Sequence, residues 1–391
     1  MIDLTKIRQD LVDYGDQLFL NSAGASLMPR SVVKKISDYL HLESRQGGYY
    51  VADQQAAELA QFEQQLAKLL GTTTRNVTFA HSATDGYVAA LSSIPFKSSD
   101  IILTSDDDYV ANQLQFLSLQ KRFGIIIKSI KNLPNGDLDL MDFEKKIKED
   151  RPRLVAVTHV PTNSGLVQDV STTGKICAEK EIIFLLDACQ SVGQMEVTID
   201  KYPCDFLTAT GRKFLRGPRG TGFMYVSDRM LEEGYEPLYP DGNGAVWTGK
   251  DTYEIADTAA RFTNWERPYA LVQGLTEALR YLHEVGIKNI ELQNKKVVTR
   301  LRERLAAIPE VALYDRGSET CNIITFRKEK KTQEDFQKAF SQHQIYYGIS
   351  QSAQGQIDFE KKGVDWVVRL SPHYFNTEEE MDRVAEIVAG I

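Results

Sequence analysis

The chain has 391 residues, of which 42% are hydrophobic and 26% charged, and this composition is ordinary for a globular protein of one or two domains. Its formal net charge of −8 argues against nucleic acid as a partner, because such binding depends on neutralising phosphates with basic side chains. The sequence has no apolar run of membrane-spanning length and no signal-peptide pattern, so we expect a cytoplasmic protein that does not bind membranes.

The cysteines exclude two further classes of site. No two of them form a CxxC pair, and none lies in a Cys/His cluster with the spacing of metal ligands, so we expect no bound metal. A disulfide framework is not expected at this length, and reduced thiols are the simpler interpretation. The four residues are Cys177, Cys189, Cys204 and Cys321.

Residues 54–70 form the first predicted element, an amphipathic helix that ends at Gly71. Short β-rich runs then alternate with helical ones. Continuous apolar strands separated by helices indicate a mostly parallel sheet that is covered on both faces. The predicted strands are 76–80, 101–104, 124–130, 153–160, 182–187, 206–210 and 222–226, and the helices between them include 84–94, 112–123 and 171–180.

From about residue 268 long helical stretches surround a few strands, which is typical of a smaller α+β domain. We predict a large domain over 15–285 and a small domain made of 1–14 and 286–391, joined through a shared helix. The predicted elements are helices over 268–285, 289–307 and 334–343, strands over 322–326 and 366–371, and a final helix from Thr377.

Ligands of open α/β sheets bind at the carboxyl ends of the strands, and four features there stand out. Asp187 ends an apolar strand, Lys213 precedes a Gly/Pro-rich turn, and the small residues of 82–86 lead from a strand into a helix, where backbone N–H groups can face an anion. Arg369, in the C-terminal part, lies inside a β-rich run. Taken singly, they are also explained as a helix cap, a solvated lysine, a capped helix start and a structural salt bridge.

Together the four features fit one chemistry, that of pyridoxal 5′-phosphate (PLP). A lysine can form an imine with the cofactor aldehyde and later move the Cα proton of a substrate. A buried carboxylate keeps the pyridine nitrogen protonated, a phosphate site anchors the cofactor, and an arginine binds the substrate α-carboxylate through a bidentate fork. The sequence therefore predicts a PLP enzyme that acts on a small amino acid.

These motifs resemble, in order and through most of the chain, the class V aminotransferase family of fold-type I PLP enzymes. The family includes cysteine desulfurases, isopenicillin N epimerase-like proteins and C–S lyases. The coupling of LLDACQSVGQ (185–194) to TATGRKFLRGPRGTG (208–222) carries most of the resemblance. It implies a large domain with a mostly parallel sheet flanked by helices and a smaller α+β domain.

The resemblance also implies roles for individual residues. It places Lys213 as the imine lysine, Asp187 at the pyridine nitrogen, Gln190 near O3′, and Tyr109 on the face of the ring. In the loop THVPTNSG, Thr162 and Asn163 compete for one cofactor contact. The phosphate contacts are Ala83, Thr84, Thr210 and Arg212, and the substrate contacts are Arg369, Asn21 and Ala23.

Members of this family are homodimers with a shared active site, so the resemblance implies a loop from the partner subunit at the phosphate, within 239–249 here. Arg216 and Arg219 stay open between phosphate, dimer contact and plain surface. Tyr49 or Tyr50 is a candidate for the lining of the substrate pocket, whereas Trp247 and Trp265 are better explained as structural.

The cofactor does not fix the reaction. The C-terminal pattern is most similar to the branch with ergothioneine-type C–S lyases, so the first hypothesis is β-elimination from an S-substituted cysteine or its sulfoxide. Class V aminotransferase activity is the alternative, and epimerase activity is weaker. Cysteine desulfurase is disfavoured because residues 348–371 contain no cysteine, and Cys189 and Cys321 are expected to be packed. A non-catalytic PLP-fold protein is disfavoured by the intact Lys213, Asp187 and Arg369.

Overall fold

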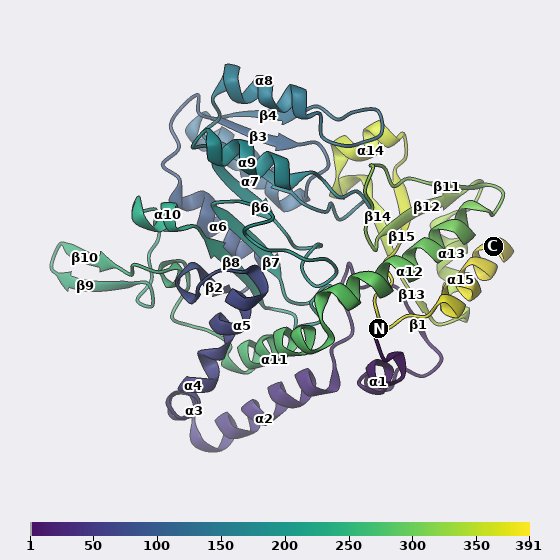
Figure 1. The fold of residues 1–391 in the computed structure, drawn as a ribbon, viewed down its shortest axis with the longest axis horizontal. Coiled ribbons are helices and arrows are strands. Elements are labelled where there is room, and N and C mark those ends of the chain that lie inside the picture. The colour runs from purple at the N-terminus through teal and green to yellow at the C-terminus, as the bar shows by residue number, and fades with distance from the viewer. Residues whose placement is uncertain (1) are drawn as a thin grey trace.

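The computed structural model describes residues 2–391, and a sheet of seven strands lies at its centre (Figure 1). The strand order is β2–β8–β7–β6–β5–β3–β4, with only β8 antiparallel to its neighbours. The mostly parallel sheet is therefore confirmed. Its strands are β2 (Val77–Ala80), β3 (Ile101–Ser105), β4 (Ile126–Ile130), β5 (Leu154–Thr158), β6 (Ile183–Asp187), β7 (Phe206–Thr210) and β8 (Gly222–Val226).

Both faces of this sheet are covered, which explains why its strands read as continuous apolar runs. In β5, Leu154 and Ala156 belong to the hydrophobic cluster under α6 and α7, whereas Val155 and Val157 belong to the cluster that includes α5, α8, α9 and α11. The helices are α5 (Gln61–Leu70), α6 (Ala83–Ser93), α7 (Val110–Phe123), α8 (Leu140–Asp150), α9 (Val170–Glu179) and α11 (Tyr269–Val285).

The first predicted helix is wrong in its extent. Instead of one helix over 54–70, the chain forms α3 (Gly48–Gln54), α4 (Ala56–Leu59) and α5, with breaks at Gln55 and Ala60. The breaks turn Glu58 toward two cations, Lys35 at 2.7 Å and Arg280 at 2.7 Å, which come from α2 (Arg30–Gln46) and α11. A tertiary ion-pair cluster outweighs local periodicity here.

The C-terminal part contains an antiparallel sheet of order β11–β12–β15–β14, with helices packed on it (Figure 1). The final helix, predicted from Thr377, begins at Glu378, and Thr377 is its N-cap. These elements are β11 (Val311–Leu313), β12 (Ile324–Lys328), β14 (Gly348–Gln351), β15 (Trp366–Leu370), α12 (Ile287–Ala306), α13 (Gln333–Gln342), α14 (Gln356–Lys362) and α15 (Glu378–Gly390).

Gly286 alone separates α11 from α12, and the domain boundaries stay a prediction. The N-terminal chain is joined to the C-terminal part, since β1 (Leu18–Phe19) pairs with β13 (Ile345–Tyr346) in a separate two-stranded sheet. A hairpin of β9 (Ala245–Gly249) and β10 (Thr252–Ile255) projects from the body (Figure 1). The shorter helices are α1 (Leu4–Gln9) and α10 (Asp228–Glu232). Within residues 2–391, no helix combines the length and the hydrophobicity needed to cross a membrane.

Candidate active site

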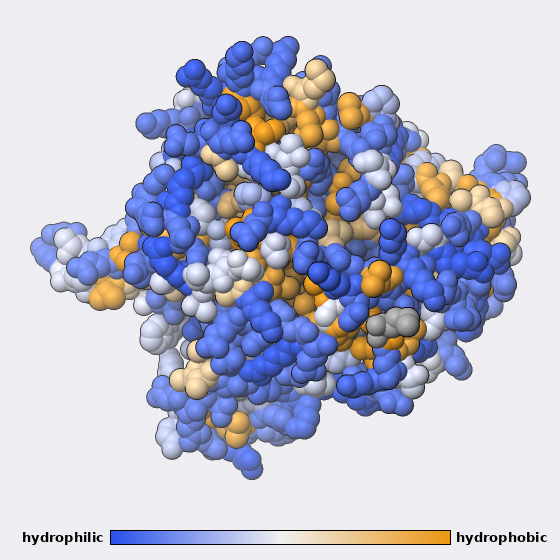
Figure 2. Space-filling model, in the orientation of Figure 1, coloured by the Kyte–Doolittle hydropathy of each residue, from blue (hydrophilic) through white to orange (hydrophobic). Residues whose placement is uncertain are grey.

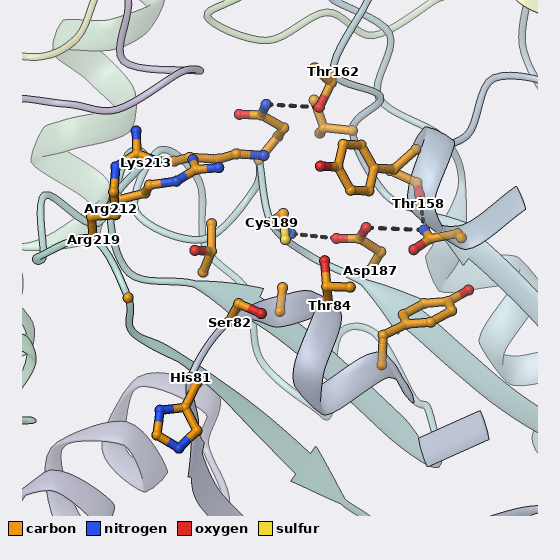
Figure 3. A pocket seen from close by; sticks show the side chains of 18 residues that line it. His81, Ser82, Thr84, Thr158, Thr162, Asp187, Cys189, Arg212, Lys213 and Arg219 are labelled. Atoms are coloured by element: carbon orange, nitrogen blue, oxygen red, sulfur yellow. Dashed lines mark hydrogen bonds between the residues drawn. The ribbon is translucent and has the colours of Figure 1, made fainter. Parts of the chain in front are cut away.

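A cavity of about 220 Å³ lies at the carboxyl edge of the central sheet (Figure 3). Thr158, Asp187 and Thr210, which line it, are the last residues of three adjacent parallel strands, β5, β6 and β7. The N-terminus of α6 closes another side. The remaining lining residues are His81, Ser82, Ala83, Thr84, Tyr87, Tyr109, Asn112, Val160, Thr162, Cys189, Gln190, Arg212, Lys213, Arg219 and Gly220.

Lys213 is buried, and among residues 2–391 no hydrogen bond or ion pair holds its Nζ. The nearest aromatic face is that of Tyr109, whose ring centroid lies 6.0 Å from the Nζ. Burial lowers the pKa of Lys213, the charges of Arg212 and Arg369 act in the same direction, and Asp187 opposes them. A buried amine without a partner and with a lowered pKa is suited to act as a nucleophile or base.

Asp187 lies across the cavity from Lys213, Arg212 and Arg219 (Figure 3). One carboxylate oxygen accepts the backbone N–H of Cys189 at 2.9 Å, and the other accepts from the side chain of Asn112 at 3.2 Å. Both bonds come from neutral donors, so the carboxylate is fixed in direction and its charge remains available to a cation in the cavity.

In the loop after β5, the two candidates for one cofactor contact, Thr162 and Asn163, lie in different surroundings. Thr162 faces the cavity, and its hydroxyl accepts from Gln190 at 3.1 Å. Asn163 does not line the cavity: its side chain donates to the carbonyl of Gln354 at 3.1 Å, and its own carbonyl accepts from Lys362 at 3.2 Å. The structure thus brings Thr162, and not Asn163, to the predicted cofactor.

Arg369 and the N-terminal residues Asn21 and Ala23 lie behind the side of the cavity that Thr162 and Gln190 form. The guanidinium donates to the carbonyl of Thr162 at 3.1 Å and to the side chain of Asn21 at 3.4 Å, and its Nε is buried without a partner. Burial, together with the nearby charge of Arg212, lowers the pKa of Arg369 to about 10. Ala23 is joined to the wall through its carbonyl, which accepts from Gln190 at 3.1 Å. A buried guanidinium with an unfilled donor is a fitting site for a carboxylate.

The opposite end of the cavity is built to hold an anion. Ser82 caps α6 by accepting from the backbone of Asp85, so Ala83 and Thr84 are the first residues of the helix and face the cavity with their backbone N–H groups unused by the helix. Position 222, which lies beside these residues, requires glycine, because a Cβ there would lie 2.9 Å from the nitrogen of Ala83. Thr210, whose hydroxyl donates to Thr221, completes this end.

The arginines of the 208–222 segment separate into two groups. Arg212 and Arg219 line the cavity, and Arg212 is tethered to the carbonyl of Gly24 at 2.5 Å. Arg216 fits none of the three roles left open for it. It is buried among Tyr281, Tyr374 and Phe375 and donates to the Tyr374 hydroxyl at 2.6 Å, so it is a structural arginine enclosed by aromatic rings.

Sequence reasoning missed Asn112, Asp108 and Thr158, which stand behind Asp187. Asn112 and Thr158 line the cavity, and Asp108 accepts from both of them. The only available signal was the run of three aspartates that follows β3, and it gave no indication of which aspartate points inward. Tyr49 and Tyr50, in contrast, are exposed on α3 and are not among the residues that line this cavity, so their place in the substrate pocket stays a prediction.

The residues that line the cavity have the chemical groups needed to bind PLP. The cavity holds an unpaired lysine, a carboxylate fixed only by neutral donors, and a helix N-terminus flanked by Arg212. The Lys213 amine can react with the cofactor aldehyde, and the Asp187 carboxylate can pair with the pyridine nitrogen. The N-terminus of α6 can bind the phosphate. Residues 2–391 contain no cluster of three acidic, histidine or cysteine side chains arranged to hold a metal ion.

Several known proteins are similar to this chain in sequence and fold. The family model of class-V aminotransferases matches residues 18–384. A probable cysteine desulfurase of Methanothermobacter thermautotrophicus is 25% identical, over 98% of this chain and 97% of its own length. The apo structure of a cysteine desulfurase from Thermococcus onnurineus NA1 is 26% identical and superposes with a TM-score of 0.92, covering 100% of this chain and 98% of its own.

A more distant structure shares the fold. It is a C-DES variant with glycine covalently linked to its PLP cofactor, 20% identical, with a TM-score of 0.86 over 98% of both chains.

Proposed function

The chain belongs to the class-V aminotransferase family and is a PLP-dependent enzyme, and on that premise we propose that it is a C–S lyase acting on an S-substituted cysteine. The observation that carries the proposal is the combination of an unpaired buried lysine with a cavity whose one cysteine in residues 2–391, Cys189, has a thiol that burial keeps protonated. β-Elimination needs a base and a leaving group and no second thiol.

When bound, PLP supplies an aldehyde for the substrate amine and a ring that accepts negative charge from the substrate Cα. Asp187 would hold the protonated ring nitrogen, and Tyr109 would lie against the ring. The N–H groups of Ala83 and Thr84, with Thr210 and Arg212, would bind the phosphate. Arg369 would bind the substrate carboxylate and so orient the Cα–H bond toward Lys213.

Lys213 is placed to move that proton, because its amine carries no competing hydrogen bond and its pKa is lowered by burial. Once the proton has been removed, the Cβ–S bond breaks and the electron pair leaves on sulfur. Water then converts the three-carbon remainder into pyruvate and ammonia. Gln190, held by Ala23 and Thr162, would keep the O3′ side of the cofactor fixed.

Cysteine desulfurase is the second candidate, because relatives of 25% and 26% identity carry that name. A desulfurase needs a thiolate that attacks the substrate sulfur. Cys189 is the only cysteine among the lining residues of the cavity in the described chain, and burial raises the pKa of its thiol, with the charge of Asp187 adding to the effect. Its backbone N–H is bonded to Asp187, so it is not on a mobile segment. A thiol kept protonated and fixed beside the cofactor carboxylate is a poor acceptor of sulfur.

A product assay tests the proposal. The PLP-loaded enzyme, incubated with S-methylcysteine sulfoxide and without a keto acid, should form pyruvate over many turnovers. The same assay with L-cysteine and Cys189→Ala separates the candidates: a lyase retains pyruvate formation, whereas a desulfurase that uses Cys189 forms alanine and loses activity in the variant. A strict requirement for a keto acid would instead identify a transaminase.

We also propose a homodimer in which the β9–β10 hairpin of one subunit reaches the phosphate end of its partner's cavity. The hairpin projects from the body, and its Trp247 is 80% exposed, which is unusual for a side chain of this kind in a monomer (Figure 1). Figure 2 shows the surrounding surface as mostly hydrophilic, with small hydrophobic patches. If the proposal holds, deleting 245–255 should yield monomers with weakened cofactor binding; a deletion that remains dimeric and binds PLP normally would contradict it.

A further inference from the structure

Two buried carboxylates share one amide behind the cavity. The side-chain nitrogen of Asn112 donates to Asp108 Oδ1 at 3.0 Å and to Asp187 Oδ2 at 3.2 Å. All three side chains are buried. An amide nitrogen has two hydrogens, so Asn112 uses both to connect the carboxylate that faces the cavity with one that does not.

Asp108 is surrounded by donors and has no cation. It accepts from the backbone of Tyr109 at 2.7 Å, from Gln113 at 2.8 Å, and from the hydroxyl of Thr158. In the part of the chain that the structure describes, neither Asp108 nor Asp187 forms an ion pair. Burying two neighbouring negative charges without a counter-charge is unfavourable, so the arrangement calls for a cation that the protein itself does not provide.

The geometry points to a role for Asp108 as a positioning residue: through Asn112 it fixes the Asp187 carboxylate and adds a second negative charge behind it, which keeps the cofactor ring nitrogen protonated. The inference rests on the proposed function, in that it takes the ring nitrogen to lie at Asp187. It deepens that function, because the electron-accepting power of the ring would then depend on a residue that touches neither cofactor nor substrate.

Few other titratable groups face this pair. Besides Asp187 from β6, they are Tyr87 from α6, a neutral phenol whose pKa burial raises, and Asp107 from the same loop, whose pKa burial also raises. Burial raises the pKa of Asp108 to about 6, the hydrogen bonds from Thr158, Asn112 and Gln113 oppose this, and Asp187 adds to it. Asp108 is therefore ionised at pH 7 and above. Around Lys213 the groups are Cys189, Asp187, Arg212, Arg369 and the ring of Tyr109.

The test uses PLP labelled with ¹⁵N in the ring and bound to the full-length protein, with the chemical shift of the ring nitrogen recorded as a function of pH. Asp108→Asn keeps the shape of the side chain and one acceptor oxygen and removes the charge. A nearby negative charge favours the protonated ring nitrogen, so the pH midpoint at which this nitrogen loses its proton should fall, by about one pH unit. Asp106→Asn is the matched control: it removes a charge two residues away that is paired with Lys361 and does not contact Asn112.

A second variant keeps the test decisive if Asp108→Asn does not fold. Gln113→Leu removes one donor to Asp108 and changes no residue of the cavity lining. It should make Asp108 harder to ionise and shift the midpoint in the same direction by a smaller amount.

Equal midpoints in wild type, Asp108→Asn and Gln113→Leu would overturn the inference. The readout needs bound cofactor and no turnover, so a protein that binds PLP and makes no pyruvate contradicts the proposed lyase function and leaves this test intact. Failure of the wild type to bind PLP would overturn both.

Discussion

The two sides of the cavity are built in opposite ways. On the carboxylate side, Asp187, Asn112 and Asp108 are buried and joined by hydrogen bonds within the subunit. On the cation side, Lys213 has no partner, and Arg369 has an unfilled donor. Both sides are buried, so exposure to water does not explain the difference.

The contrast indicates which groups are scaffold and which wait for a ligand. A buried polar group without a partner lowers the stability of the ligand-free protein, and this cost is recovered only when an anion or an aldehyde arrives. A group with all its partners costs less and can tune its neighbours. If this is correct, removing groups from the cation side should harm function and spare stability, and removing comparable bonded groups elsewhere should do the reverse.

The largest effect is expected for Lys213→Ala. Loss of the amine removes both the link to the cofactor and the base, so turnover should fall by about a thousandfold or more, and the visible absorption band of the bound cofactor should disappear. Thermal stability of the ligand-free protein should stay equal or rise, because an unpaired buried amine is removed. The measurements are absorption spectra after addition of PLP and melting curves without it.

A matched control for this variant is Lys362→Ala. Lys362 is also a buried lysine, but its Nζ is paired with Asp358 at 2.5 Å and donates to the carbonyl of Asn163. Its removal leaves Asp358 buried and unpaired, so stability should fall by about 3 kcal/mol while the absorption band remains. Equal losses of stability in Lys213→Ala and Lys362→Ala would contradict the contrast between the carboxylate side and the cation side.

Arg369→Met is expected to have the next largest effect. The substrate carboxylate loses its bidentate partner, so kcat/KM should fall by about a hundredfold, mainly through KM, while binding of PLP persists. The ligand-free protein should be no less stable, since Arg369 lies close to the charge of Arg212 and has an unfilled Nε. Arg216→Met supplies the contrast: Arg216 also has one buried nitrogen without a partner, but it is enclosed by aromatic rings and donates to Tyr374 and to the carbonyl of Leu27, so this variant should unfold more easily.

The sequence was sufficient for most of the scaffold of this site. The apolar runs that predict β6 and β7 end at Asp187 and Thr210, as the strands do, whereas the run predicted over 153–160 continues two residues beyond Thr158, where β5 ends; all three strand ends line the cavity. Strand ends could be predicted because buried parallel strands are continuously hydrophobic and their ends are marked by the first polar residues. The resemblance to a family supplied the roles of these residues, and those roles stay predictions.

What could not be predicted depends on tertiary contacts. The side chain of Asn163 turns to the carbonyl of Gln354, and the backbone carbonyl of Asn163 accepts from Lys362, so its direction is set by a segment almost two hundred residues away. The inward orientation of Asp108 depends on donors from α7 and β5 that no local pattern specifies. Arg216 looked like one more arginine of a basic segment, and only the aromatic residues of the C-terminal part give it a buried place.

The smallest expected effect is a pH-dependent change in the free energy of unfolding when Asp108, on the carboxylate side, is replaced. The pKa of Asp108 in the folded protein is raised to about 6, above the value of 3.8 for an unperturbed aspartate. The folded state therefore holds its proton to higher pH than the unfolded state does, and the free energy of unfolding falls as pH rises from about 4 to about 6. Asp108→Asn removes this dependence, so the ligand-free variant should gain on the order of 2 kcal/mol relative to the wild type between those two pH values.

Chemical denaturation of the ligand-free proteins at pH 4 and pH 7 measures this difference, with Asp106→Asn as the control that should follow the wild type. Binding of PLP should reduce the advantage of Asp108→Asn at pH 7, because the ring nitrogen supplies the positive charge that the two carboxylates lack. An equal difference between variant and wild type at both pH values would show that Asp108 titrates in the folded protein as it does in the unfolded chain, so that its pKa is not raised by folding. The hydrogen bonds to Asp108 would then fully offset its burial, and the contrast with the cation side would concern hydrogen bonds alone and not the burial of charge.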